Sequence, residues 1–175
     1  MTRFVALLRG VNVNGITVKS AELAELFRTL GFTDVRTVLA SGNVVFETTD
    51  ARDALTLKPT IEAALGTRFG YDAWIVLLPH DRLAAAVAAY PFPEDDATHP
   101  YVVFASAPDV HADVTAFAAT LAPDGVERAE PGDGVLYWRC PRGSSTDTPL
   151  AKHLARAQYR ATTTTRNLRT LRKLL

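Results

Sequence analysis

The sequence has 175 residues, of which 47% are hydrophobic and 22% charged, and its formal net charge is zero. This composition is typical of a globular protein with one ordinary domain or two small ones, and it excludes a disordered chain. No apolar run reaches the roughly 20 residues that span a bilayer, and no signal-peptide core opens the sequence. Cys140 is the only cysteine, so no intramolecular disulfide can form, and we expect a cytoplasmic protein.

The first part of the chain has the pattern of a split βαβ unit. Gly31 predicts the end of the first helix, and Pro59 predicts that the regular part of the second helix begins near Lys58. The predicted elements are a strand over 3–8, a helix over 19–30, strands over 35–39 and 44–47 joined through Ser41-Gly42, a helix within 51–65 that ends at Gly66, and a strand over 71–78.

The pattern recurs after a proline-rich loop over 90–100. The predicted elements of this second part are a helix over 81–89, a strand over 101–105, a helix over 109–121, strands over 126–129 and 135–139, a helix over 149–158 and an amphipathic helix over 165–175. We therefore expect an α+β fold of two ferredoxin-like halves, residues 1–79 and 80–175, with mainly antiparallel sheets.

Several predicted strands are apolar on both faces, for example residues 4–8 and 74–78. An antiparallel sheet with one wet face should alternate between apolar and polar residues. We therefore expect both faces of the sheets to be largely covered.

Three polar segments interrupt this apolar chain: Arg9 to Gly15, Ser41 to Asn43, and Thr162 to Asn167. In a split βαβ unit the loop after the first strand and the hairpin between the second and third strands leave the same end of the sheet. We therefore expect the first two segments to converge. The threonines of the third segment could cap the last helix, with Arg166 and Asn167 in its first turn.

The chemistry of these segments is that of an anion receptor. Arginine offers a planar fork to a carboxylate or phosphate, asparagine and serine offer hydrogen bonds, and glycine permits close approach of the backbone. Glycine and asparagine are also ordinary residues of tight turns, so a structural role stays open. The candidate ligand-binding residues are Arg9, Asn12, Asn14, Gly15, Ser41 and Asn43, with Arg166 and Asn167 as contributors from the second half.

The three segments together resemble a bacterial family, domain of unknown function 1697. The resemblance spans nearly the whole chain, and it implies a duplicated ferredoxin-like fold without an established activity. The matching motifs are Val5 to Val13 with Gly15, Gly31-Phe32, Val35 to Thr37, Ser41 to Phe46, and Thr164 to Asn167 with Thr170 and Leu174.

We hypothesise a small-molecule-binding protein that recognises an anionic ligand, either a nucleotide or a phosphorylated metabolite. The cofactor and any catalysed reaction stay undefined. Two alternatives remain open: a nucleic-acid-binding protein that uses the basic C-terminal segment, and a structural homodimer without a ligand. The basic segment, residues 151–175, has a local charge of about +7 and no acidic residue. Its simpler explanation is a solvated face packed against the acidic remainder of the chain.

Catalytic and metal-binding constellations are weak. The histidines lie in separate predicted elements, without the spacing of a zinc site, and no base lies near Ser41 within the polar segments. Glu94-Asp95-Asp96 could suggest a hard-cation site, although a solvated loop is the simpler interpretation. Cys140 lies between Arg139 and Arg142, which could depress the pKa of its thiol, although a buried position at a strand end is the simpler expectation.

Overall fold

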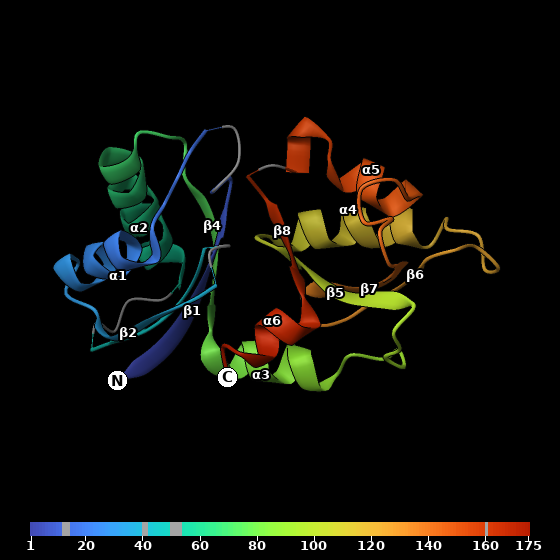
Figure 1. The fold of residues 1–175 in the computed structure, drawn as a ribbon, viewed down its shortest axis with the longest axis horizontal. Coiled ribbons are helices and arrows are strands. Elements are labelled where there is room, and N and C mark those ends of the chain that lie inside the picture. Colours follow the sequence, from blue (N-terminus) through green and yellow to red (C-terminus); the bar gives the residue numbers. More distant parts are fainter. Residues whose placement is uncertain (12–14, 40–41, 50–53, 160) are drawn as a thin grey trace. The chain divides into compact units, whose positions relative to one another are not determined.

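The structure is a computed structural model that describes residues 1–11, 15–39, 42–49, 54–159 and 161–175 (Figure 1). Within these residues the elements follow in the order β1 (Thr2–Arg9), α1 (Ser20–Thr29), β2 (Thr33–Val38), β3 (Asn43–Thr48), α2 (Ala54–Phe69), β4 (Trp74–Pro79), α3 (His80–Ala88), β5 (Thr98–Ala105), α4 (Pro108–Ala118), β6 (Arg128–Pro131), β7 (Val135–Pro141), α5 (Pro149–Leu154), the 3-10 helix η1 (Ala157–Tyr159), β8 (Thr163–Asn167) and α6 (Leu168–Arg172). None of the helices among them is long and apolar enough to cross a membrane.

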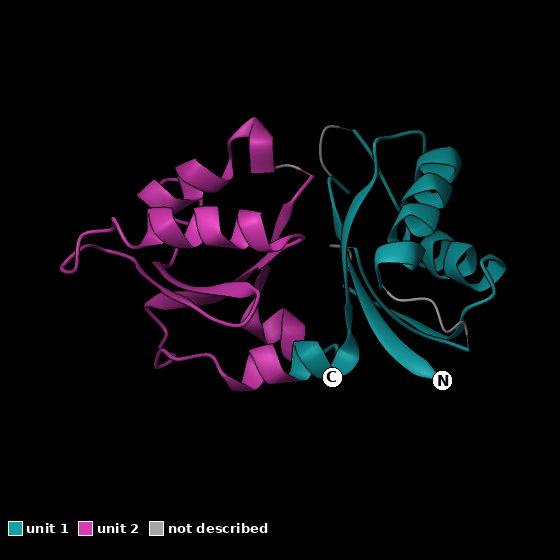
Figure 2. Ribbon diagram, turned by 180° about the vertical axis from the view of Figure 1, so that it is seen from behind, with its two compact units in different colours: residues 1–84, 173–175 teal, residues 85–172 magenta. Residues whose placement is uncertain are grey.

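The chain forms two compact units (Figure 2). Unit 1 comprises residues 1–84 together with Lys173–Leu175, and unit 2 comprises residues 85–172. The chain therefore leaves unit 1 within α3 and returns to it after α6. The halves expected from the sequence divide at residue 79, which is the last residue of β4.

Unit 1 is a four-stranded antiparallel sheet in the order β2-β3-β1-β4. Because β1 and β2 both run antiparallel to β3, they are parallel to each other, as a split βαβ unit requires. Helices α1 and α2 pack on one face of this sheet (Figure 1). The core beneath them includes Phe27, Phe32 and Phe46, whose rings lie 4.4–5.9 Å apart between centroids.

Unit 2 repeats this topology, with strand order β6-β7-β5-β8 and antiparallel pairing throughout. Helices α4 and α5 pack on one face, where Val114 and Leu150 meet Leu136 and Trp138. The predicted α+β fold of two split βαβ halves is confirmed.

Both faces of the sheets are buried at their central strands, which agrees with the apolar pattern of the sequence. On β1, Phe4, Ala6 and Leu8 belong to the core that α1 and α2 cover. Val5 and Leu7 project from the opposite face because side chains alternate along a strand, and both are fully buried.

The predicted end of α2 at Gly66 was wrong. The helix runs through Gly66 to Phe69, and it also contains Pro59, so its regular part does not begin near Lys58. The side chains that hold the helix are fully buried and recur every four residues: Leu57, Ile61 and Leu65. Burial of this apolar stripe outweighs the cost of an internal proline, about 3 kcal/mol.

The predicted C-terminal helix over 165–175 was also wrong in its first part and in its last three residues, because α6 ends at Arg172. Residues 163–167 form β8, which pairs with β5 from Tyr101↔Asn167 to Ala105↔Thr163. β-branched threonines fit a strand better than a helix start. The helix α6 begins only at Leu168, where Asn167 Oδ1 accepts a hydrogen bond from the Arg169 amide at 2.9 Å.

Candidate functional site

The end of β1 and the β2–β3 hairpin lie together in unit 1. The Leu8 amide donates a hydrogen bond to the Gly42 carbonyl at 2.8 Å, one step beyond the last β1–β3 pair, Leu7↔Asn43. Gly42 has φ = +72° and is packed against Leu8 and Val11. The first two polar segments therefore meet at one end of the sheet.

Gly10 follows Arg9 directly and provides open space at this end of the sheet. Its φ is +80°, and a β-carbon added to it would meet no atom of the described residues within 4 Å. The same holds for Gly15, where φ is +79°. Open space beside a left-handed glycine lets a ligand approach the main chain closely. Asn12, Asn14 and Ser41 lie outside the described residues.

Asn43 lies at the start of β3 and is completely buried. Its side-chain Nδ2 donates to the Val38 carbonyl at 2.9 Å, across the register pair Val38↔Asn43 that closes the hairpin. This bond links the ends of β2 and β3 and fixes where the hairpin emerges. Asn43 is therefore a positioning residue for the hairpin.

Arg9 is the last residue of β1 and is half-buried. In the β1–β4 register it lies directly opposite Trp74, the first residue of β4. Residues opposite each other in an antiparallel pair point to the same face, with β-carbons about 5 Å apart. The side chains of Arg9 and Trp74 therefore begin at neighbouring positions on the same face of the sheet.

An open pocket of about 740 Å³ lies at the junction of α2 and β4, at this same end of unit 1. Its polar side chains include two carboxylates and a hydroxyl, from Glu62, Asp72 and Thr67. Burial raises the pKa of Tyr71, which also lines it, to about 12, so the phenol stays protonated. Glu62 is held by Lys58 and accepts the Ile75 amide at 2.9 Å.

Arg166 and Asn167 lie in unit 2, on β8. The Arg166 guanidinium donates to Thr164 Oγ1 at 2.6 Å and to the Thr165 carbonyl at 3.0 Å, while Asn167 opens α6. Both residues precede α6, which begins at Leu168, so their predicted place in the first turn of the last helix was wrong.

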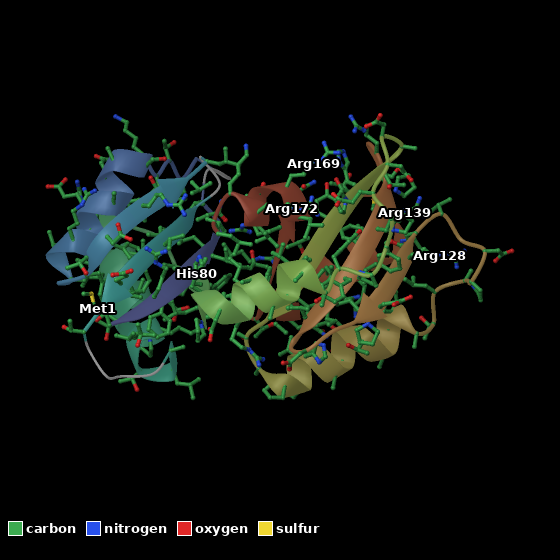
Figure 3. All side chains as sticks on the ribbon, turned by 90° about the horizontal axis from the view of Figure 1, so that it is seen from below. Met1, His80, Arg128, Arg139, Arg169 and Arg172 are labelled. Atoms are coloured by element: carbon green, nitrogen blue, oxygen red, sulfur yellow. The ribbon has the colours of Figure 1, made fainter. Side chains whose placement is uncertain are left out.

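The basic C-terminal segment is partly neutralised within unit 2. Arg172 makes two hydrogen bonds to the Glu94 carboxylate, at 2.9 and 2.6 Å, and these bonds lower the pKa of Glu94. Arg169 lies on the same short helix, α6 (Figure 3). Lys173 belongs to unit 1, where its carbonyl accepts a bond from Arg36 at 2.9 Å.

The acidic loop before β5 has structural partners. Asp95 Oδ1 accepts hydrogen bonds from the amides of Ala97 and Thr98, and Oδ2 contacts Arg139 at 2.6 Å. Hydrogen bonds from Thr98 and Arg139 lower the pKa of Asp95 to about 2. Among the described residues, no group of three or more His, Cys, Asp or Glu side chains is arranged to hold a metal ion.

Cys140 is fully buried on β7, and burial raises the pKa of its thiol to about 11, with a further contribution from Glu127. The neighbouring arginines therefore do not depress this pKa, and the thiol stays protonated at neutral pH.

Trp74 and the α2–β4 pocket were missed by sequence reasoning. The split βαβ topology already places the start of the fourth strand at the end of the sheet where Arg9 lies. The exact pairing of Arg9 with Trp74 depends on the strand register, which an apolar run does not specify.

Comparisons with known proteins agree with this fold. A family model described as "Protein of unknown function (DUF1697)" matches residues 1–137. The chain is also similar to the solved structure of the conserved bacterial protein SP0830 from Streptococcus pneumoniae. The two share 25% identity over 99% of this chain and 96% of that one, with a TM-score of 0.79. A search of curated proteins gave no match.

Proposed function

The chain belongs to the DUF1697 family of proteins of unknown function, and from that premise we propose that unit 1 binds an anionic small molecule, a nucleotide or a phosphorylated metabolite. The binding site is the end of the sheet where β1 and the β2–β3 hairpin meet. One observation supports this proposal above others: the Leu8–Gly42 hydrogen bond holds the hairpin beside Arg9 and the open main chain at Gly10. A cationic fork next to accessible backbone suits a phosphate or carboxylate.

In this proposal Arg9 contacts the anion, and Gly10 and Gly15 give it room. Asn43 acts indirectly, because its buried side chain holds the hairpin through Val38. Arg166 and Asn167 remain outside the proposed contacts, since both have local partners on β8 and α6. A cytoplasmic location belongs to the same proposal and is supported by the single cysteine.

A thermal-shift screen with nucleotides and phosphorylated metabolites tests this function. A ligand at 100 times its dissociation constant should stabilise the protein by about 2.7 kcal/mol. We expect Arg9→Gln to abolish the shift and Arg28→Gln, which removes an exposed charge from α1, to preserve it. If no phosphorylated compound shifts the wild type, or if Arg9→Gln shifts as the wild type does, the proposal fails.

The same protein separates the two rival functions. Binding to single-stranded RNA that weakens steeply with salt, without a small-molecule shift, would favour the basic segment as a nucleic-acid surface. A stable dimer by light scattering, again without a ligand shift, would favour the structural homodimer.

A further inference from the structure

The cation at the proposed site has an aromatic neighbour. Arg9 and Trp74 are directly opposite in the β1–β4 register, and the adjacent pair, Leu8↔Ile75, belongs to the core under α1 and α2. Because side chains alternate along both strands, Arg9 and Trp74 project together from the other face. Both residues are half-buried, so each has an accessible part.

A second apolar group lies across β1 from Trp74. Leu39 belongs to the hairpin that Gly42 joins to Leu8, and it is 49% exposed with φ = +59°. A leucine in the left-handed region is strained, and its exposure gains no burial in return. The central strand β1 thus ends in a cation, with an indole beside it on β4 and an exposed leucine on the β2–β3 hairpin.

We propose that the ligand is a nucleotide rather than a phosphorylated metabolite without a ring. Its phosphate pairs with Arg9, and its base packs against the Trp74 indole. This inference rests on the proposed anion-binding function and specifies its ligand class. Stacking of a base on an aromatic side chain tightens binding by roughly 5- to 150-fold.

The experiment compares adenosine 5′-monophosphate, ribose 5-phosphate and adenosine by titration of the full chain. We expect the nucleotide to bind roughly 5- to 150-fold tighter than ribose 5-phosphate, and adenosine to bind more weakly than the nucleotide. The nucleotide should also quench tryptophan fluorescence. The quenching should disappear in Trp74→Phe, because the remaining tryptophan, Trp138, is buried in unit 2 with its indole N–H on Glu127 at 2.9 Å.

Trp74→Leu should remove the preference for the nucleotide over ribose 5-phosphate, whereas Trp74→Phe should retain most of it. If Trp74→Leu fails to fold, the wild-type comparison and Trp74→Phe still decide. Equal, Arg9-dependent affinity for nucleotide and ribose 5-phosphate would overturn the nucleotide inference and leave the anion-binding function standing. If neither the nucleotide nor ribose 5-phosphate binds, both the nucleotide inference and the anion-binding function are overturned. If adenosine binds as tightly as the nucleotide, the phosphate does not pair with Arg9 and the inference is overturned.

Discussion

The backbone of Gly42 lies directly against the side chain of Leu8: a β-carbon on Gly42 would be 2.9 Å from the Leu8 Cβ. It would also lie 2.7 Å from Val11 Cγ2. Gly42→Ala therefore combines a left-handed alanine with overpacking, and we expect a loss of about 2–4 kcal/mol in unfolding free energy.

The matched control is Gly134→Ala, because Gly134 has φ = +70° and, within the described part of the chain, no atom lies within 4 Å of its added β-carbon. Gly134→Ala should lower the unfolding free energy only because alanine disfavours the left-handed backbone, by about 1–2 kcal/mol. Chemical denaturation of both variants measures the difference. Equal losses would mean that the hairpin is not packed against β1 as described.

Asn43→Ala should destabilise the protein even without a ligand. The change removes the buried hydrogen bond that Asn43 donates to the Val38 carbonyl. Loss of this bond should lower the unfolding free energy by about 1–3 kcal/mol. Asn167→Ala is the control, because Asn167 is half-exposed and caps only the short helix α6. Wild-type stability of Asn43→Ala together with loss of ligand binding would instead make Asn43 a direct ligand contact.

Leu174→Ala should lower stability by about 2–5 kcal/mol. Leu174 is fully buried, and its carbonyl accepts hydrogen bonds from Arg36 at 3.2 Å and His80 Nε2 at 3.0 Å within unit 1. Leu175→Ala, at a residue that is 45% exposed, should have little effect. Hydrogen exchange would test this, because amides of unit 1 should lose protection in the first variant. Unchanged protection there would contradict the assignment of Leu174 to unit 1.

Acid should weaken unit 2 through His153. The Tyr159 hydroxyl donates a hydrogen bond to Asp113 Oδ2 at 2.5 Å and is hydrogen-bonded to His153 Nε2 at 2.9 Å. The His153 imidazole stacks on the Phe117 ring, with 3.8 Å between centroids. Its Nδ1 is buried without a hydrogen-bond partner among the described residues. Burial, with a smaller contribution from Arg156, lowers the pKa of His153, and Asp113 opposes this shift.

The direction of the pH effect follows from that lowered pKa. As the pH falls, His153 binds a proton near pH 6.5 in the unfolded state but only at lower pH in the folded state. The contribution of neutral His153 to the unfolding free energy is therefore complete above pH 6.5 and is lost as the pH falls towards the folded-state pKa. We expect the unfolding free energy, measured by chemical denaturation, to fall less steeply between pH 7 and pH 5 in His153→Gln than in the wild type. His99→Gln, on β5, should keep the wild-type slope. An unchanged slope in His153→Gln would refute the assignment.

Local patterns in the sequence predict most of the strands, and the exceptions have identifiable causes. The leucine spacing of Leu168, Leu171 and Leu175 favoured a helix from residue 165, but pairing with β5 makes the threonines before it a strand. Pro59 suggested a late start for α2, yet a buried apolar stripe keeps it helical. Local propensity yields to tertiary packing in both cases.

The candidate site was likewise predictable from the sequence only in part. Topology alone predicts that the loop after β1 meets the β2–β3 hairpin, because strand order decides which loops share an end of the sheet. The burial of Asn43 and the pairing of Arg9 with Trp74 depend on register and on side-chain packing. Neither can be seen in the types of residues that follow one another along the chain.

The return of residues 173–175 to unit 1 affects the order in which the protein is made. When a ribosome has synthesised residues 1–172, all four strands of unit 1 are present, but Leu174 and its carbonyl are still missing. The contacts of Leu174 with Arg36 and His80 can form only after the whole of unit 2 has been made, and contacts of such long sequence separation slow folding. Although unit 1 is first in the sequence, unit 2 is the first whose residues are all available.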